Sequence, residues 1–177
     1  RVVMTAIRRL RIPVDTVESF VYSSPEHQAT CSYDSYKSCV LTISSGLVEL
    51  LEPKELSFVV GHELGHFLLN HPANAHSVSP YVSELMLASQ QAELSADRVG
   101  LIACDSIDVA VWALMKTFSG LSTQHLNFDV SEFVSQINDR SNLDVDQTIS
   151  SHPSMIIRSR ALLWFSMSAF MVKSTGR

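Results

Sequence analysis

Cysteine, basic charge and long apolar runs are scarce in this sequence, and each scarcity excludes a class of protein. The three cysteines, Cys31, Cys39 and Cys104, have no CxxC spacing, so they fit neither a disulfide framework nor a thiolate zinc site. The formal net charge of −5 argues against a nucleic-acid-binding protein, which needs clustered Lys and Arg. The longest apolar run, from Ala161 to Val172, is shorter than the ~20 residues of a membrane-spanning helix.

The thiols also bear on where the protein works. Reduced cysteines are the default and favour a cytoplasmic location. A Cys31 to Cys39 bridge across a hairpin is the alternative, and it would place the protein in an oxidising compartment such as the periplasm. The chain begins at Arg1 without an initiator Met, so an upstream signal or membrane segment could have been removed and the parent protein could be membrane-associated.

What the chain does contain is an ordered, globular composition. Apolar residues make up 46% and charged residues 18%, with only six Gly and six Pro. A chain of 177 residues fits one domain with a core of its own, so residues 1–177 are expected to form a single domain. The one basic cluster, Arg8, Arg9 and Arg11, is typical of a solvated helix face.

Periodicity predicts a mostly helical α+β domain that carries a short sheet. β-rich runs predict strands at Val17–Tyr22 and Cys39–Ile43. The helical segments are predicted from apolar spacing and capping residues: Val2–Leu10, a short turn in GLVELL, a helix from Pro53 that stops at His71-Pro72, Tyr81–Cys104, a helix from Ser106 as N-cap to Gly120, one from Asp129, and one from Pro153.

The stretch GHELGHFLLNH, from Gly61 to His71, concentrates three histidines and a glutamate. On a helix His62 and His66 lie about 40° apart around the axis and one turn apart along it, so both rings can reach one zinc ion. Glu63 sits beside them, where the HExxH pattern needs a base. His71 lies about 140° from His66, so an intact helix excludes it from the ligand set. A histidine pair without metal is the alternative interpretation.

A third ligand is predicted from the segment AELSADRVG. Glu93 and Asp97 are four residues apart on one face of the next helix, so Glu93 can complete a His, His, Glu site while Asp97 hydrogen-bonds a ligand imidazole. A solvated acidic face paired with Arg98 is the alternative. Three protein ligands leave a fourth position for water, whose proton Glu63 would take and pass to a leaving amine. The pattern therefore favours hydrolysis of a peptide bond.

Three ordered motifs resemble the HtpX-like and CAAX prenyl protease type 1 family of zinc endopeptidases, a branch of the gluzincins. ISSGLVELLEPKELSFVVGHELGHFLLNH is similar to that family's strand, Gly-Leu turn and HExxH helix. AELSADRVGL is similar to its ExxAD helix, and SHPSMIIRSRAL to its His-Pro segment with a following arginine. The resemblance implies a zincin-like metalloprotease domain in which His62, His66 and Glu93 are the zinc ligands. It also implies that Glu63 is the general base and that Asp97 is the partner of a ligand histidine.

The same resemblance gives roles to two late residues. His152 and Arg158 match the family's positions near the metal cleft, so His152 is expected to stabilise the oxyanion or to occupy the fourth zinc position in a resting state. The alternatives are that His152 only caps the last helix and that Arg158 makes a structural ion pair. The remaining histidines have no motif context and are expected at the surface: His27, His76 and His125.

The substrate of such an enzyme is predicted to be a protein or peptide. The strand at Cys39–Ile43 precedes the metal helix, and in similar enzymes such an edge strand pairs with an extended substrate. Asn-Ala and Pro-Gly-Gly elements that the family often shows around this strand are missing, and so are its membrane-spanning helices, so cleavage of prenylated proteins is not carried over. The alternative function is a latent or nonhydrolytic zinc-containing protein-binding module, held latent by His152 or by the loop Asn70–Tyr81. Glu63 favours the enzyme, because a structural metal site needs no base.

Overall fold

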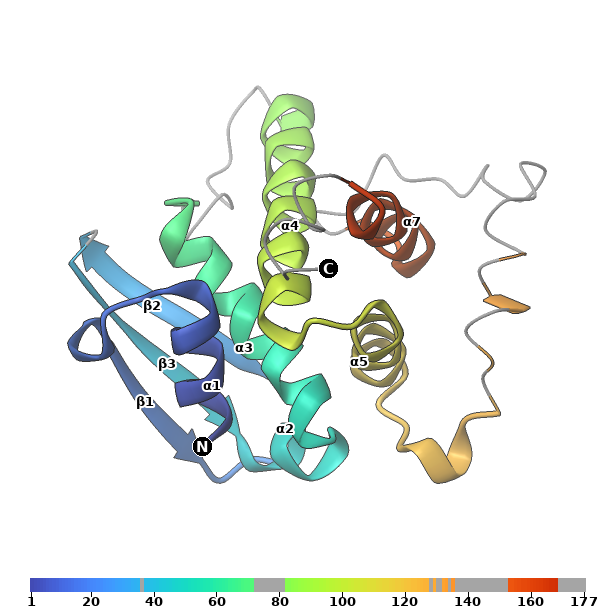
Figure 1. The fold of residues 1–177 in the computed structure, drawn as a ribbon, viewed down its shortest axis with the longest axis horizontal. Coiled ribbons are helices and arrows are strands. Elements are labelled where there is room, and N and C mark those ends of the chain that lie inside the picture. Colours follow the sequence, from blue (N-terminus) through green and yellow to red (C-terminus); the bar gives the residue numbers. More distant parts are fainter. Residues whose placement is uncertain are drawn as a thin grey trace.

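A computed structural model of the chain describes residues 1–35, 37–71, 82–127, 129, 132–133, 135 and 153–168. In chain order the elements are α1 (Val2–Leu10), η1 (Val14–Thr16), β1 (Val17–Tyr22), β2 (Ala29–Ser35), β3 (Ser38–Ser44), α2 (Ser45–Leu50), α3 (Pro53–Leu68), α4 (Val82–Cys104), α5 (Ile107–Ser119), η2 (Thr123–His125) and α7 (Met155–Ser166). The sheet and α1 lie at one side of the molecule, α3 and α4 run through its middle, and α5 and α7 lie at the other side (Figure 1). The prediction of a predominantly helical α+β domain with a small sheet is confirmed.

The three strands form a sheet in the order β1-β3-β2, with β3 parallel to β1 and antiparallel to β2. Alternate side chains of β3 face the core, so Cys39, Leu41 and Ile43 are buried. The expectation that this strand is an edge strand is wrong, because β3 is the middle strand and β2 is the edge that contacts α3. The strand β2, ATCSYDS, was not predicted, since it lacks a run of β-branched or aromatic residues.

Among the described residues, two hydrophobic clusters hold the elements together, and α3 contributes to both. Val60 and Leu64 belong to the cluster that α3 shares with α1, α2 and the sheet. Phe58 belongs to the second cluster, which includes residues of α4, α5 and α7. A helix that is apolar on more than one face is central rather than peripheral, so α3 is fixed from both sides.

Helix boundaries follow the local capping chemistry. The side chain of Ser106 accepts a hydrogen bond from the Val109 N–H at the start of α5, and Gly120 ends that helix with φ 69°, as predicted. α2 is a six-residue helix rather than a turn. α3 ends at Leu68, three residues before the predicted stop at His71. The helix predicted from Asp129 lies largely outside the described residues.

Small residues let α3 and α4 approach closely. A Cβ added to Gly61 would lie 2.4 Å from the Cβ of Ala103, and one added to Gly65 would lie 3.0 Å from the Cα of Ala96. Neither space can hold a methyl group without a shift of the helices. The glycine before each histidine of the HExxH motif therefore keeps the two helices close enough for their polar side chains to meet.

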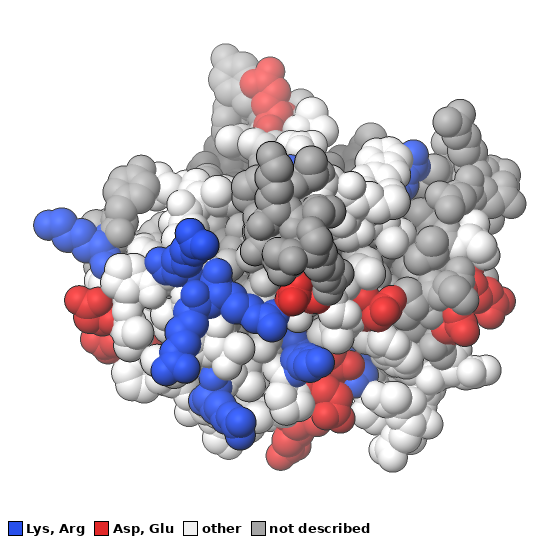
Figure 2. Space-filling view, viewed as in Figure 1, with Lys and Arg blue, Asp and Glu red and all other residues white. Residues whose placement is uncertain are grey.

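The surface charges and hydropathy are unremarkable for a globular domain. Arg8, Arg9 and Arg11 are exposed, and Lys and Arg gather in Figure 2 over the part of the molecule that α1 occupies in Figure 1, with acidic side chains beside them. In the described part of the chain, no helix combines the length and the apolar character that crossing a bilayer requires.

Candidate metal centre

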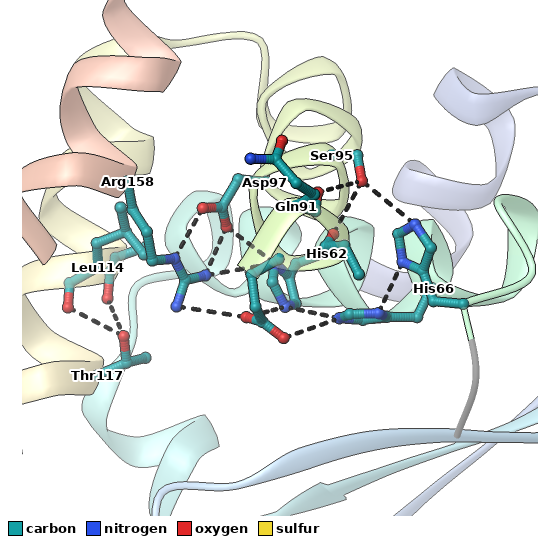
Figure 3. A network of polar contacts seen from close by, with 12 residues as sticks. His62, His66, Gln91, Ser95, Asp97, Leu114, Thr117 and Arg158 are labelled. Atoms are coloured by element: carbon teal, nitrogen blue, oxygen red, sulfur yellow. Dashed lines mark hydrogen bonds and ion pairs between the residues drawn. The ribbon is translucent and has the colours of Figure 1, made fainter. Parts of the chain in front are cut away.

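Two histidines of α3 and one glutamate of α4 converge between these helices, within the polar network drawn in Figure 3. The Nε2 atoms of His62 and His66 are 3.1 Å apart. One Glu93 oxygen lies 3.5 Å from the His62 Nε2 and the other lies 3.5 Å from the His66 Nε2. Ligand atoms arranged tetrahedrally at about 2.0–2.1 Å from one zinc ion are about 3.3–3.4 Å apart, so this donor set fits a metal ion.

The second nitrogen of His62 is held by a buried carboxylate. His62 Nδ1 lies 2.9 Å from Asp97 Oδ1, and Asp97 is 0% exposed. Arg158 of α7 donates to both Asp97 oxygens, from Nε at 2.7 Å and from Nη2 at 2.5 Å (Figure 3). The alternative of a solvated acidic face paired with Arg98 is wrong, because Glu93 and Asp97 are both buried and Arg98 lies over the ring of Phe165.

The hydrogen bonds fix the protonation of this pair. Burial alone opposes charge on Asp97, but the hydrogen bonds from Arg158 and His62 outweigh it and lower the pKa of Asp97 to about 2. Burial likewise lowers the pKa of His62, but the hydrogen bond to Asp97 and the charge of that carboxylate outweigh burial and leave the pKa raised. A charged Asp97 keeps a proton on His62 Nδ1, so the unprotonated Nε2, which faces His66 and Glu93, could bind a metal ion.

Glu63 lies beside these candidate metal-binding side chains, but its surroundings differ from those of Asp97. Burial raises the pKa of the Glu63 carboxyl to about 7, and the negative charge of Glu93 adds to the rise. The charge of His62 and the backbone of Cys31, in β2, act in the opposite direction and lower this pKa. A carboxyl that can exchange a proton near neutral pH has the property that a general base requires.

His71 contacts the metal cluster through His66 rather than by joining it. The Nδ1 atoms of His71 and His66 are 2.9 Å apart, and the hydroxyl of Tyr33 in β2 donates to the backbone carbonyls of both residues. Burial and the neighbouring His62 lower the pKa of His66 to about 4, and burial also lowers the pKa of His71. The helical wheel missed this contact, because α3 ends before His71; Asn70, a residue that favours helix ends, was the available signal.

The structure brings together six of the predicted site residues: His62, Glu63, His66, Glu93, Asp97 and Arg158. His152 lies outside the described residues, as does His76. His27 and His125 are exposed, as expected for surface histidines. The three cysteines are free thiols.

Comparisons with known proteins place the chain in a family. A family profile described as peptidase family M48 matches residues 1–90 of the 177, just over half of the chain. The match contains both histidines of α3 and ends three residues before Glu93, so the support for Glu93 comes from its sequence motif and from the geometry of the cluster.

A curated relative extends the likeness over most of the chain. Plastoglobule-localized metallopeptidase 48, chloroplastic, of Arabidopsis thaliana is 25% identical over 183 aligned positions, which cover 88% of this chain and 53% of the relative. The chain thus spans about half the length of that protein. No solved structure matches the chain significantly. With its helical α+β fold and its His, His, Glu cluster, the chain belongs to peptidase family M48.

Proposed function

We propose that residues 1–177 form the catalytic domain of a zinc-dependent endopeptidase of the HtpX-like and CAAX prenyl protease type 1 branch. The observation that carries this proposal is the meeting of His62 Nε2, His66 Nε2 and the Glu93 carboxylate at separations of 3.1–3.5 Å. Two imidazoles and one carboxylate suit zinc better than magnesium or calcium, which prefer oxygen ligands. Membership of peptidase family M48 supports the same chemistry.

Each residue of the site has a task in this proposal. Zinc held by His62, His66 and Glu93 would supply a Lewis acid for the scissile carbonyl group. Glu63 takes a proton from the attacking water and delivers it to the leaving nitrogen, which its pKa of about 7 permits in both directions. Asp97 orients His62, and Arg158 keeps the buried Asp97 charged.

The substrate is proposed to be an extended stretch of a protein. β2 is the edge strand beside α3, the helix that carries Glu63, and the backbone of its residue Cys31 influences the pKa of the Glu63 carboxyl. A peptide that adds to a sheet edge gains main-chain hydrogen bonds whatever its side chains are. The role first expected of the strand at Cys39–Ile43 is therefore given to β2.

The location of the protein and the role of His152 are predictions from the sequence. The plant relative is by name a metallopeptidase of plastoglobules, and only the metallopeptidase activity is proposed for this chain. A cytoplasmic, periplasmic or membrane-associated location remains a sequence-based prediction. The oxyanion role of His152 likewise remains one, since that residue lies outside the described part of the chain.

The proposal is tested by measuring zinc content and cleavage of an unfolded protein, such as casein, side by side. The wild type should bind one zinc ion and cleave. Glu63→Gln should keep the zinc and lose cleavage by about 10²-fold or more, because the amide cannot accept the proton. Glu84→Gln, which changes an exposed glutamate of α4, is the matched control and should behave as the wild type.

One combination of results would contradict the proposed endopeptidase activity. A wild type that holds zinc but cleaves nothing, even after His152→Ala, would identify a nonhydrolytic binding module instead.

A further inference from the structure

The end of α3 is shaped so that the chain folds back over the last metal-binding histidine. Asn70 has φ 52°, the left-handed conformation that commonly follows a helix. The N–H of Asn70 donates to the Phe67 carbonyl at 3.2 Å, and the N–H of His71 donates to the His66 carbonyl at 2.9 Å. These two bonds define a Schellman motif, in which the residue after the left-handed one meets the residue five positions earlier. His71 is therefore placed on His66 by the backbone itself.

A second observation concerns the hydroxyl of Tyr33. It donates to the His66 carbonyl at 2.9 Å and also to the His71 carbonyl. This hydroxyl ties both ends of the turn to the edge strand β2, and the ring of Tyr33 packs on Phe67 with centroids 5.5 Å apart. The backbone of the turn is thus held from the helix and from the sheet.

The side chains of the turn form a series of hydrogen bonds in which each group donates to the next. His66 Nε2 faces His62 and Glu93, so for a metal ligand the proton of His66 must be on Nδ1. That N–H points at His71 Nδ1, 2.9 Å away, which must then be the acceptor. The proton of a neutral His71 is in turn on Nε2, which lies 3.2 Å from Ser95 Oγ.

This series of hydrogen bonds ends at backbone carbonyls of α4. Ser95 Oγ lies 2.8 Å from the Gln91 carbonyl and 3.0 Å from the Ala92 carbonyl, to which its hydroxyl donates (Figure 3). Every donor in the series His66, His71, Ser95 finds an acceptor, and no nitrogen of His71 is left to face the metal cluster. This geometry excludes His71 as a ligand and gives it another task.

We infer that His71 is a positioning residue, which holds His66 in the orientation and tautomer that a metal ion needs, and that Ser95 anchors it. The inference rests on the proposed metal site. It gives the two ligand histidines of α3 different supports. His62 is supported by a buried charged pair, Asp97 with Arg158, whereas His66 is supported by a neutral imidazole and a hydroxyl.

The test compares zinc affinity among variants of the whole chain, measured with zinc ion alone against a chromophoric chelator. His71→Leu keeps an apolar contact but removes the acceptor, and we expect zinc affinity to fall about 10- to 100-fold. His71→Asn puts an amide oxygen near the position of Nδ1, so affinity should stay close to that of the wild type. His27→Leu changes an exposed histidine and is the matched control.

A spectroscopic measurement separates positioning from a general loss of structure. In the zinc-loaded wild type, NMR should show two slowly exchanging imidazole Nδ1–H protons, from His62 and His66. In His71→Leu only the signal of His66 should be lost, because the support of His62 is untouched. Rescue of both the signal and the affinity by His71→Asn would complete the case.

Three results would overturn the inference. If His71→Leu binds zinc as tightly as the wild type, His71 does not support the ligand. If folded His71→Asn is as weak as His71→Leu, the acceptor atom is not what matters. A wild type that binds no zinc would overturn the metal site itself, and with it this inference.

Discussion

Single residues of the candidate site differ in protonation because their surroundings differ. Asp97 receives hydrogen bonds from Arg158 and His62, so its pKa falls to about 2 and its carboxylate is charged at neutral pH. Glu63 is partly buried with weaker compensation, so its pKa rises to about 7 and it can exchange protons near neutrality. Two carboxyl groups with pKa values so far apart can perform different tasks in one site, one as a fixed charge and one as a base.

A prediction at this scale concerns the carboxylates of α4. Glu93→Gln replaces a proposed ligand with a neutral amide, so zinc affinity should fall by more than in Asp97→Asn. For Asp97→Asn, which alters only the support of His62, we expect a loss of about 10- to 100-fold. Competition titration with a zinc chelator measures both, with Glu49→Gln at an exposed glutamate as the control. Unchanged affinity in Glu93→Gln would remove Glu93 from the ligand set.

Residues related by helical spacing could be predicted from the sequence. His62 with His66, and Glu93 with Asp97, are each four apart on one helix, and the structure brings the two pairs together. The ion-pair partner of Arg158 was left open, because Arg158 comes from α7 and only tertiary packing decides its contact with Asp97. His71 was missed because its position depends on one left-handed residue at the helix end.

At the scale of elements, the decisive feature is the close packing of α3 on α4. Gly61 faces Ala103 and Gly65 faces Ala96. Side-chain volume at either glycine would separate the helices. The proposed ligand atoms come from both helices and lie within 4.8 Å of one another, so a small separation would open the candidate site. The glycines of the GHELGH sequence thus support the proposed metal centre through packing.

This packing predicts the sign of a glycine substitution. At an open helix position Gly→Ala stabilises a protein by roughly 0.5–1 kcal/mol. For Gly65→Ala we expect the opposite, a loss of about 1–3 kcal/mol in the free energy of unfolding, because the new Cβ meets α4 backbone at 3.0 Å. Urea unfolding measures it, with Lys54→Ala on the exposed side of α3 as the control. A more stable Gly65→Ala would show that the helices are not in tight contact.

A buried ion pair connects α3 to α5 and carries a second prediction at this scale. Lys116 is 1% exposed, and its Nζ lies 2.7 Å from Glu55 Oε2, which also accepts from the Glu52 N–H at 2.8 Å. Lys116→Met leaves that carboxylate buried without its cation, so unfolding free energy should fall by about 3–5 kcal/mol. In urea unfolding, exposed Lys54→Met should change little. Equal midpoints for the two variants would contradict the prediction.

Elements with strong local signals could be predicted, and those that depend on tertiary pairing could not. α5 has a Ser N-cap and a Gly stop, and its limits agree with the prediction. β2 is polar along most of its length, and its pairing with β3 and its contact with α3 decide its conformation. For the same reason, the order of strands that makes β3 central could not be read from the sequence.

At the scale of the whole molecule, the fold does not depend on the metal ion alone. α3 lies in both hydrophobic clusters, so its position is set by apolar packing on two sides. A metal ion would add one more link between α3 and α4. The architecture therefore predicts a domain that stays folded without metal but is less stable.

Chelation tests this prediction. Treatment with EDTA should preserve the far-ultraviolet circular dichroism spectrum at 25 °C but lower Tm, and added zinc at about 100 times Kd should restore roughly 2.7 kcal/mol. Glu93→Gln, which lacks a proposed ligand, should show a much smaller shift. Loss of helical signal on chelation would contradict the view that the two clusters suffice.

The most direct test of the metal centre is anomalous diffraction at the zinc absorption edge from crystals of the zinc-loaded chain. One peak is expected between α3 and α4, about 2.0–2.2 Å from His62 Nε2, His66 Nε2 and a Glu93 carboxylate oxygen. A peak at any other place, or none in crystals of fully loaded protein, would contradict the account.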